Sequence, residues 1–235
     1  MKVAIINHSD IKGGAARAAY RIHHAIRCQG VDSQMYVNEA MAGDWTVTGP
    51  EGNWGKGFSL IRSSLGFLLT KTLKTYNKVT HSSAIFPSKW PSIINKSDSD
   101  IIHLHWINKE MLSIGDISRF KLPVVWTLHD MWAFCGAEHY TEEFRWRDGY
   151  TRRNRPDYES GFDLNKWVWN RKRRTWHHQL QVVTPSRWLA DCVKQSILFK
   201  GWPVSVIPNC IDTELWQPIE KKQARKLLRL PPNIP

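Results

Sequence analysis

Short runs of β-branched and apolar residues alternate along this chain with longer stretches of helical periodicity. The runs lack polar alternation, which is typical of strands covered by helices on both faces. They occupy residues 2–7, 34–37, 101–106, 124–128, 181–184 and 204–207. The helical stretches between them are residues 14–29, 111–120, 164–177 and 186–199. This order predicts an α/β fold with a Rossmann-like, doubly wound and mostly parallel sheet.

Composition limits the class of protein further. The chain has 235 residues, of which 42% are hydrophobic and 23% charged, as in ordinary globular domains. A net charge of +12 favours polyanions, an acidic membrane face or phosphate-bearing ligands. The four cysteines form no C-x-x-C pair, and the four-residue apolar run at the N-terminus is too short for a secretory signal. We therefore expect a protein of the reducing cytoplasm.

Polar residues follow five of the predicted strands. Ligands of open parallel sheets bind beyond the carboxyl ends of the strands, so we expect these residues to converge on one cleft. They are Asn7, His8, Ser9, Lys12, Gly13, Gly14, His105, Trp106, Asn108, His129, Asp130, Pro185, Ser186, Arg187, Asn209 and Asp212.

A glycine pair opens the first helix. Gly13 and Gly14 would let a phosphate approach the free N–H groups of a helix N-terminus, although an ordinary tight turn has the same sequence. At the end of another strand, His129 would offer a neutral imidazole to the cleft.

An H-x-H pair raises the question of a metal. His103 and His105 lie two apart on a strand and share a face, and His129 with Asp130 would complete a metallohydrolase-like set. No carboxylate stands at ligand spacing from the pair, and His103 is as well interpreted as a buried structural histidine. We expect no metal site.

Residues 56–78 carry five basic residues and no acidic one. Their apolar positions form a helical stripe of Phe58, Ile61, Leu65, Leu68, Leu69 and Leu73. Such a helix covers the sheet, or lies on an anionic membrane through Arg62, Lys71 and Lys74, or does both if it is only partly docked. Only eight uncharged residues separate Arg62 from Lys71, too few to span a bilayer.

Residues 142–174 mix ten basic and six acidic residues with Trp146, Tyr150, Trp167 and Trp169. Cations beside flat rings suit single-stranded nucleic acid, so a basic nucleic-acid or polyanion-binding module without catalysis is an alternative function. No compact nucleic-acid motif is present, and we expect no nucleic-acid partner.

Five motifs, in order and over most of the chain, resemble the N-terminal half of family-four glycosyltransferases. These are retaining enzymes of GT-B architecture, and the resemblance is to members that act in colanic acid and exopolysaccharide biosynthesis. The motifs read GGAARAAYRIHHAI, HLHW, VVWTLHDMWAFCGAEHY, VVTPSRWLADCV and VSVIPNCIDTELWQP.

The resemblance implies a hexosyltransferase of cell-surface polysaccharide biosynthesis. It would move a sugar from a nucleotide-sugar co-substrate to a glycan or lipid-linked acceptor, without a cofactor, in the cytoplasm or peripherally on the inner face of the plasma membrane. Gly13 and Gly14 would approach the donor diphosphate, and His129 would stand beside the transferring sugar as the catalytic residue. The residues implied for the acceptor side are His105, Trp106, Asp130, Trp132, Ser186 and Arg187.

The resemblance also implies a domain organisation. Residues 1–216 would form the N-terminal, acceptor-binding lobe, and residues 217–235 a linker towards a missing C-terminal donor-binding lobe in the same or a separate chain. We therefore expect little turnover from this chain alone. The sequence departs from the family at Cys210, where relatives usually have Gly, and it lacks the cysteines that many relatives carry after the H-Y pair.

Overall fold

A parallel sheet of seven strands forms the centre of the structure, a computed structural model that describes residues 1–50 and 52–231. The strand order is β3-β2-β1-β5-β6-β8-β9, and every neighbouring pair is parallel. The strands are β1 Lys2–Ile6, β2 Asp32–Tyr36, β3 Val47–Thr48, β5 Ile101–Leu104, β6 Val124–Thr127, β8 Gln181–Thr184 and β9 Val204–Val206. The predicted α/β, Rossmann-like sheet is confirmed.

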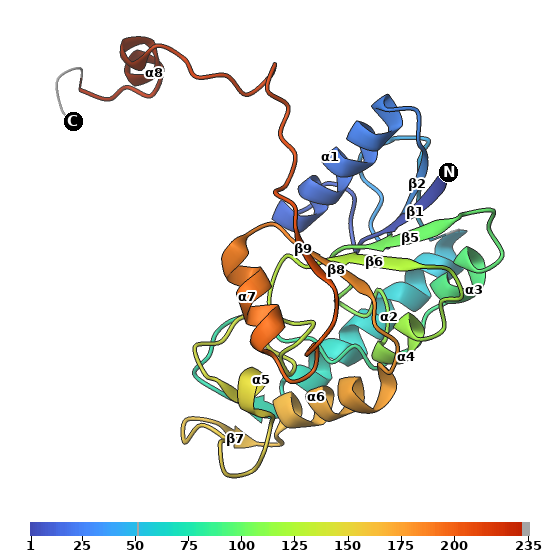
Figure 1. Cartoon of the computed structure of the whole chain (residues 1–235), viewed down its shortest axis with the longest axis vertical. Helices are drawn as coiled ribbons and strands as arrows, with labels where there is room; N and C mark the ends of the chain where they lie inside the picture. The colour runs from blue at the N-terminus through green and yellow to red at the C-terminus, as the bar shows by residue number, and fades with distance from the viewer. Residues whose placement is uncertain (51, 232–235) are drawn as a thin grey trace.

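Helices cover both faces of this sheet (Figure 1). Helix α1 (Gly14–Cys28) packs on one face, while α3 (Trp90–Ile94), α4 (Ile114–Ile117) and α6 (Leu164–Thr175) pack on the other. Helix α2 (Gly52–Thr70) lies on the side of α3 and α4, and α7 (Arg187–Gln195) connects β8 to β9. The remaining elements are β4 Leu73–Lys74, α5 Arg145–Asp148, β7 Ser160–Gly161 and α8 Lys221–Leu227.

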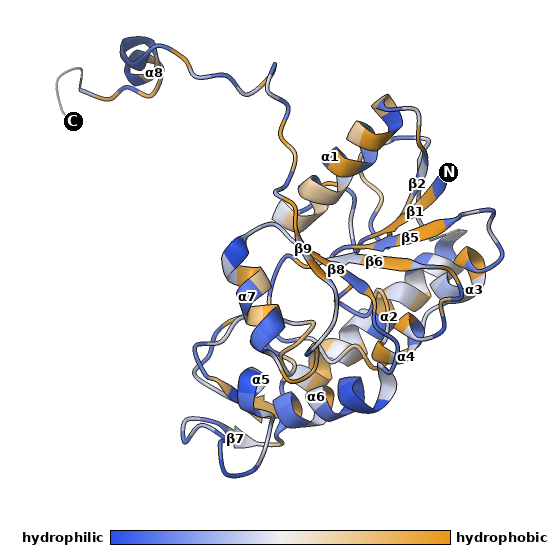
Figure 2. Cartoon of the chain, viewed as in Figure 1, coloured by the Kyte–Doolittle hydropathy of each residue, from blue (hydrophilic) through white to orange (hydrophobic). Residues whose placement is uncertain are grey.

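Alternation along the strands divides the core between the two faces. Val3 and Ile5 pack with Ala19 of α1, whereas Ala4 and Ile6 belong to the larger cluster on the opposite face. Hydrophobic residues are concentrated on the central strands, and the outer surface of α6 is hydrophilic (Figure 2). The central strands β1, β5, β6 and β8 are therefore largely buried, while their carboxyl ends remain free to bear a site.

The main departures from the predicted elements have local causes. The helix expected over residues 111–120 is reduced to α4, and Lys109 and Glu110 just before it adopt left-handed φ angles of 52° and 59°. Ser113 and Asp116 then form a capping box that starts the helix at Ile114. The helix expected over residues 56–78 begins earlier, at Gly52, and ends at Thr70. The unpredicted elements β3, α3, α5, β7 and α8 are too short to show periodicity.

The basic and aromatic segment 142–174 is folded into the domain, with part of its aromatic rings in the core. Trp146, Tyr150 and Trp169 are buried. The Arg145 guanidinium, also buried, lies 2.8 Å from the Asp163 carboxylate and 3.3 Å from that of Glu159. These three rings therefore serve the core, whereas Phe144, Tyr158 and Phe162 of the same segment are exposed.

The chain leaves the sheet after β9 and ends in α8, away from the body of the domain (Figure 1). None of the residues of α8 is buried. This segment contains the predicted linker, of which residues 232–235 lie outside the described residues. Cys210 does not have a positive φ, so the turn there differs from one that requires glycine.

Candidate functional site

A pocket of about 370 Å³ opens at the carboxyl edge of the sheet, where β1, β5 and β6 end. Polar residues that follow these three strands converge on it, as the strand order predicts. Its lining consists of Asn7, His8, Ser9, Lys12, Gly13, Gly14, Ala15, Ala16, Thr80, Trp106, Lys109, His129, Asp130 and Tyr140.

The floor of the pocket is fixed by hydrogen bonds between strand ends. The Asn7 side-chain oxygen accepts from the Trp106 backbone N–H at 2.7 Å, and the His8 N–H donates to the Trp106 carbonyl at 2.8 Å. The ends of β1 and β5 are thus held in register beyond the sheet, and both Asn7 and His8 are buried.

The rim beside α1 is positively charged. Gly13 has a φ of 99°, which a side chain would strain, and it leads directly into a helix without a side-chain cap or an acidic residue in its first turn. Lys12 and Lys109 stand on the same rim, with Lys12 Nζ 3.1 Å from a Glu39 carboxylate oxygen. Free N–H groups beside two ammonium groups suit a phosphate.

His129 reaches the pocket from the end of β6. Burial lowers its pKa to about 4, so the imidazole is neutral at pH 7 despite the adjacent Asp130. Its Nε2 atom lies 3.0 Å from His105 Nδ1, and its carbonyl accepts from the Tyr140 hydroxyl at 3.1 Å. The pairing with His105 occupies Nε2 and leaves Nδ1 as the ring nitrogen that can serve a ligand.

Asp130 fixes the neighbouring aromatic wall. Its carboxylate accepts hydrogen bonds from Trp106 Nε1 at 2.8 Å, His139 Nδ1 at 2.6 Å and the Trp132 N–H at 3.0 Å. Burial alone would raise the pKa of Asp130, but the His139 ring and these hydrogen bonds lower it below its usual value. An ionised Asp130 therefore holds the Trp106 indole in place at the pocket.

Two residues expected on the acceptor side do not reach it, which corrects the prediction. His105 is only 2% exposed and lies behind His129, to which it is hydrogen-bonded. Trp132 is 1% exposed, packs against Trp126 and Trp176, and donates Nε1 to the Ser82 carbonyl at 3.0 Å. Trp132 is in the core because the turn after Asp130 directs it inward.

Ser186 and Arg187 are exposed at the end of β8 but are not part of the pocket lining. The Ser186 hydroxyl accepts from the Leu189 N–H at 3.2 Å and caps α7. Their assignment to the acceptor side stays a prediction.

Lys109 and Tyr140 line the pocket although sequence reasoning did not select them. Lys109 Nζ lies 5.9 Å from the centre of the Trp106 ring. Its left-handed backbone is followed by that of Glu110, whose carboxylate accepts from Ser83 Oγ at 2.7 Å and the Phe86 N–H at 2.9 Å. Two consecutive non-glycine residues in this region are unusual, and such strain collects at functional sites. In the sequence, Lys109 stands three residues after Trp106 and so close to the end of a predicted strand, which was the available indication that it belongs to the site.

The H-x-H pair is part of a packed row of histidines. The ring centres of His103 and His105 are 4.2 Å apart, and His103 Nε2 lies 2.8 Å from Thr127 Oγ1. Burial lowers the pKa of His103 to about 4 and that of His105 well below its usual value. Within residues 1–50 and 52–231, no three His, Cys, Asp or Glu side chains are grouped to hold a metal ion.

Comparisons with known proteins identify one matching family. The model of Glycosyltransferase Family 4 matches residues 12–215. None of the curated proteins searched matches the sequence significantly.

Two solved structures of Anabaena Alr3699/HepE are similar in fold. The complex with UDP and glucose has a TM-score of 0.45 and 15% identity, covering 97% of this chain and 50% of that one. The complex with UDP has a TM-score of 0.43 and 14% identity, again covering 97% and 50%. The chain thus spans about half the length of these structures.

Proposed function

This chain belongs to glycosyltransferase family 4, and on that premise we propose that its pocket forms one side of a site for sugar transfer from a nucleotide-sugar. The acceptor would be a glycan or lipid-linked glycan of cell-surface polysaccharide biosynthesis. One observation carries the proposal: a cationic rim and a neutral imidazole meet in a single pocket at the carboxyl edge of the sheet.

The cationic rim suits the leaving diphosphate. The N-terminus of α1, with Gly13 and Gly14, would face the phosphates, and Lys12 and Lys109 would offset the negative charge that grows as the glycosidic bond breaks. Metal is not needed for that stabilisation. In this proposal a second, donor-binding lobe in the same or a separate chain contributes the remaining diphosphate contacts and completes a GT-B enzyme that retains the anomeric configuration.

The opposite wall suits the two sugars. A neutral His129 can hydrogen-bond a hydroxyl of the transferring hexose through Nδ1 without placing a second cation beside the oxocarbenium-like carbon. Trp106 offers an indole face to the acceptor, held by Asp130, and Tyr140 stands beside them. Residues 1–216 would accordingly act as the acceptor-binding lobe, on the cytoplasmic side of the membrane where lipid-linked glycans are extended.

Replacing His129 tests the assignment. Protein with its donor-binding lobe supplied, in the same or a separate chain, is incubated with membranes of its source cell and radiolabelled UDP-glucose, UDP-galactose or GDP-mannose. We expect label in the glycan fraction from at least one donor, and an initial rate about 100-fold lower for His129→Ala because a contact to the reacting sugar is lost. The exposed His177, which follows the end of α6, provides the control variant His177→Ala, which should keep the wild-type rate.

Two results would contradict the proposal. One is the absence of label from all three donors when the donor-binding lobe is present. The other is a His129→Ala rate equal to that of wild type and of His177→Ala.

A further inference from the structure

Helix α2 presents its apolar side to the outside of the molecule. Only Arg62 and Gly66 of this helix are buried. Five large apolar side chains, spaced four, three, four and three residues apart, are between 42% and 94% exposed: Trp54, Phe58, Ile61, Leu65 and Leu68. An ordinary surface helix buries this stripe and exposes its polar side. For Phe58, Ile61, Leu65 and Leu68 of the predicted stripe the structure therefore excludes the interpretation in which it covers the sheet, whereas Leu73 lies beyond the helix in β4 and is buried.

The inward side of α2 is held by polar and close contacts. The Arg62 guanidinium, 6% exposed, donates to the Phe86 carbonyl at 3.1 Å and to the Glu110 carbonyl. The Ser63 hydroxyl donates to the Lys109 carbonyl at 2.8 Å. At Gly66, a β-carbon would lie 2.5 Å from a Glu110 carboxylate oxygen. Rotating the helix to bury its stripe would break these contacts, so the exposed apolar face is built into the fold.

This burial also corrects one predicted membrane contact. Arg62 was expected to face anionic lipid, but its guanidinium is inside the protein and bonded to backbone carbonyls. Lys71 and Lys74 are exposed, as expected.

The charge around α2 is of one sign. From residue 52 to residue 97 the chain has seven Lys and Arg and no Asp or Glu. Lys56 lies near the start of α2, and Lys71, Lys74 and Lys78 follow its end, all four exposed. Apolar side chains flanked by lysines suit an anionic lipid surface, where the chains enter the acyl region and the ammonium groups meet the headgroups.

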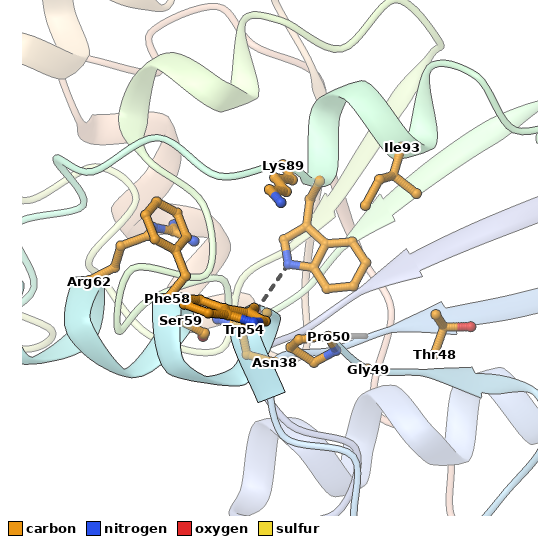
Figure 3. Close-up of a pocket in the computed structure, with 12 residues that line it drawn as sticks. Asn38, Thr48, Gly49, Pro50, Trp54, Phe58, Ser59, Arg62, Lys89 and Ile93 are labelled. Carbon is orange, nitrogen blue, oxygen red and sulfur yellow. Dashed lines mark hydrogen bonds between the residues drawn. The ribbon is translucent and has the colours of Figure 1, made fainter. Parts of the chain in front are cut away.

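A hollow of about 400 Å³ continues the apolar stripe at the N-terminal end of α2. Trp54 and Phe58 of α2 lie on one side, with Pro50 nearby, and Ile93 of α3 lies opposite (Figure 3). Trp90 also lines it and has its indole N–H satisfied by the Asn38 side-chain oxygen at 3.0 Å. Its lining rings can therefore contact a hydrocarbon chain without leaving that N–H unpaired.

We propose that α2 is an in-plane membrane anchor that docks this domain on an anionic bilayer. The helix is about 28 Å long and lies parallel to the surface, with Phe58, Ile61, Leu65 and Leu68 in the acyl region. Nowhere in the described part of the chain is a helix both long and apolar enough to cross a bilayer. The Ser63 hydroxyl of α2 bonds the carbonyl of Lys109, and Lys109 lines the pocket. The docked helix therefore keeps the pocket close to the bilayer. That this position serves a lipid-linked acceptor rests on the proposed function.

Vesicle co-sedimentation tests the anchor without nucleotide-sugar. The full chain is mixed with vesicles of phosphatidylcholine and phosphatidylglycerol (70:30) or of phosphatidylcholine alone. We expect binding to the anionic vesicles, weakened by salt and by Lys71→Glu with Lys74→Glu. The triple variant Ile61→Gln, Leu65→Gln and Leu68→Gln should lose binding at least 30-fold. Its matched control carries the same change at the exposed Ile211, Leu215 and Ile219 and should bind as wild type.

Each other result overturns the anchor. Equal binding by wild type and the α2 variant would show that another surface holds the lipid. Failure of the wild-type chain to co-sediment with vesicles contradicts the proposed membrane anchor, whatever the oligomeric state of the chain. If it also sediments as a dimer in analytical ultracentrifugation, and the α2 variant as a monomer, the stripe is covered by a second copy. The vesicle assay tests the anchor independently of the proposed function, because it contains no nucleotide-sugar. The variant His129→Ala, which should lose sugar transfer, should bind vesicles normally.

Discussion

Replacing Lys172 with Met is expected to lower the free energy of unfolding by about 3–5 kcal/mol, because it removes the donor that satisfies three buried backbone carbonyls. Lys172 lies in α6 and is 0% exposed. Its Nζ atom donates to the Gly136 carbonyl at 2.7 Å, the Cys135 carbonyl at 3.1 Å and the Trp132 carbonyl, and lies 3.7 Å from the centre of the Trp132 ring. Methionine fills the space but leaves all three carbonyls without a donor.

The cost is large because the environment is dry. Burial lowers the pKa of Lys172 to about 7, yet three acceptors and an aromatic face are what the three hydrogens of an ammonium group require. The turn that carries the Trp132 carbonyl also supplies the Trp132 N–H to Asp130. Loss of the Lys172 contacts would therefore also disturb Asp130 at the wall of the pocket.

Thermal unfolding followed by circular dichroism measures this effect. We expect the melting temperature of Lys172→Met to fall by about 10 °C for a domain of this size. Arg174→Met removes a positive charge from the same helix at an exposed position and should shift it by no more than about 1 °C. Equal melting temperatures for the two variants would show that the three carbonyls find other donors.

Acid is expected to destabilise the domain through its buried histidines. The pKa values of His103 and His129 are lowered by burial to about 4, as is that of His23, which is held between Ser33 Oγ at 2.8 Å and Thr46 Oγ1 at 2.7 Å. In the unfolded chain a histidine has a pKa of about 6.5. Between these values the unfolded chain binds protons that the folded one does not.

Stability therefore rises with pH across this window and falls as pH drops from about 6.5 to about 4. One such site contributes about 3 kcal/mol over the window, and neighbouring rings such as His103 and His129 do not add independently. Above pH 6.5 these histidines are neutral in both states, and their contribution to the pH dependence disappears.

Urea unfolding at pH 7.5, 6.0 and 5.0 checks the sign and the source. His103→Gln keeps a side chain able to bond Thr127 but removes one titrating group, so the loss of unfolding free energy towards pH 5.0 should be smaller than in wild type. His177→Gln, at an exposed position, should reproduce the wild-type slope. Identical slopes for all three proteins would assign the acid sensitivity elsewhere.

The strands and the position of the pocket could be predicted from the sequence because both depend on local pattern. Runs such as residues 101–104 have no other stable place than a buried sheet, and parallel strands bring Asn7, Trp106 and His129 to one edge. Of the expected site residues, Gly13, Gly14, Trp106, His129 and Asp130 do line the pocket.

Tertiary contacts decided what the sequence could not. Trp132 was expected on the acceptor side and Lys172 stands in the basic segment 142–174, but the two side chains contact each other inside the core. Arg62 lies in a helix whose periodicity correctly identifies an apolar stripe, while the direction of that stripe depends on carbonyls at Phe86 and Glu110. No pattern along the helix itself records those partners.

The left-handed pair Lys109 and Glu110 links two surfaces that otherwise share no strand or helix. Both carbonyls are bound by α2, through Ser63 and Arg62, while the Lys109 side chain belongs to the pocket rim. His129, in contrast, follows β6 and is anchored by the sheet. A tilt of α2 would therefore shift Lys109 relative to His129, so the helix that we propose to lie on lipid is coupled to the pocket through this lysine.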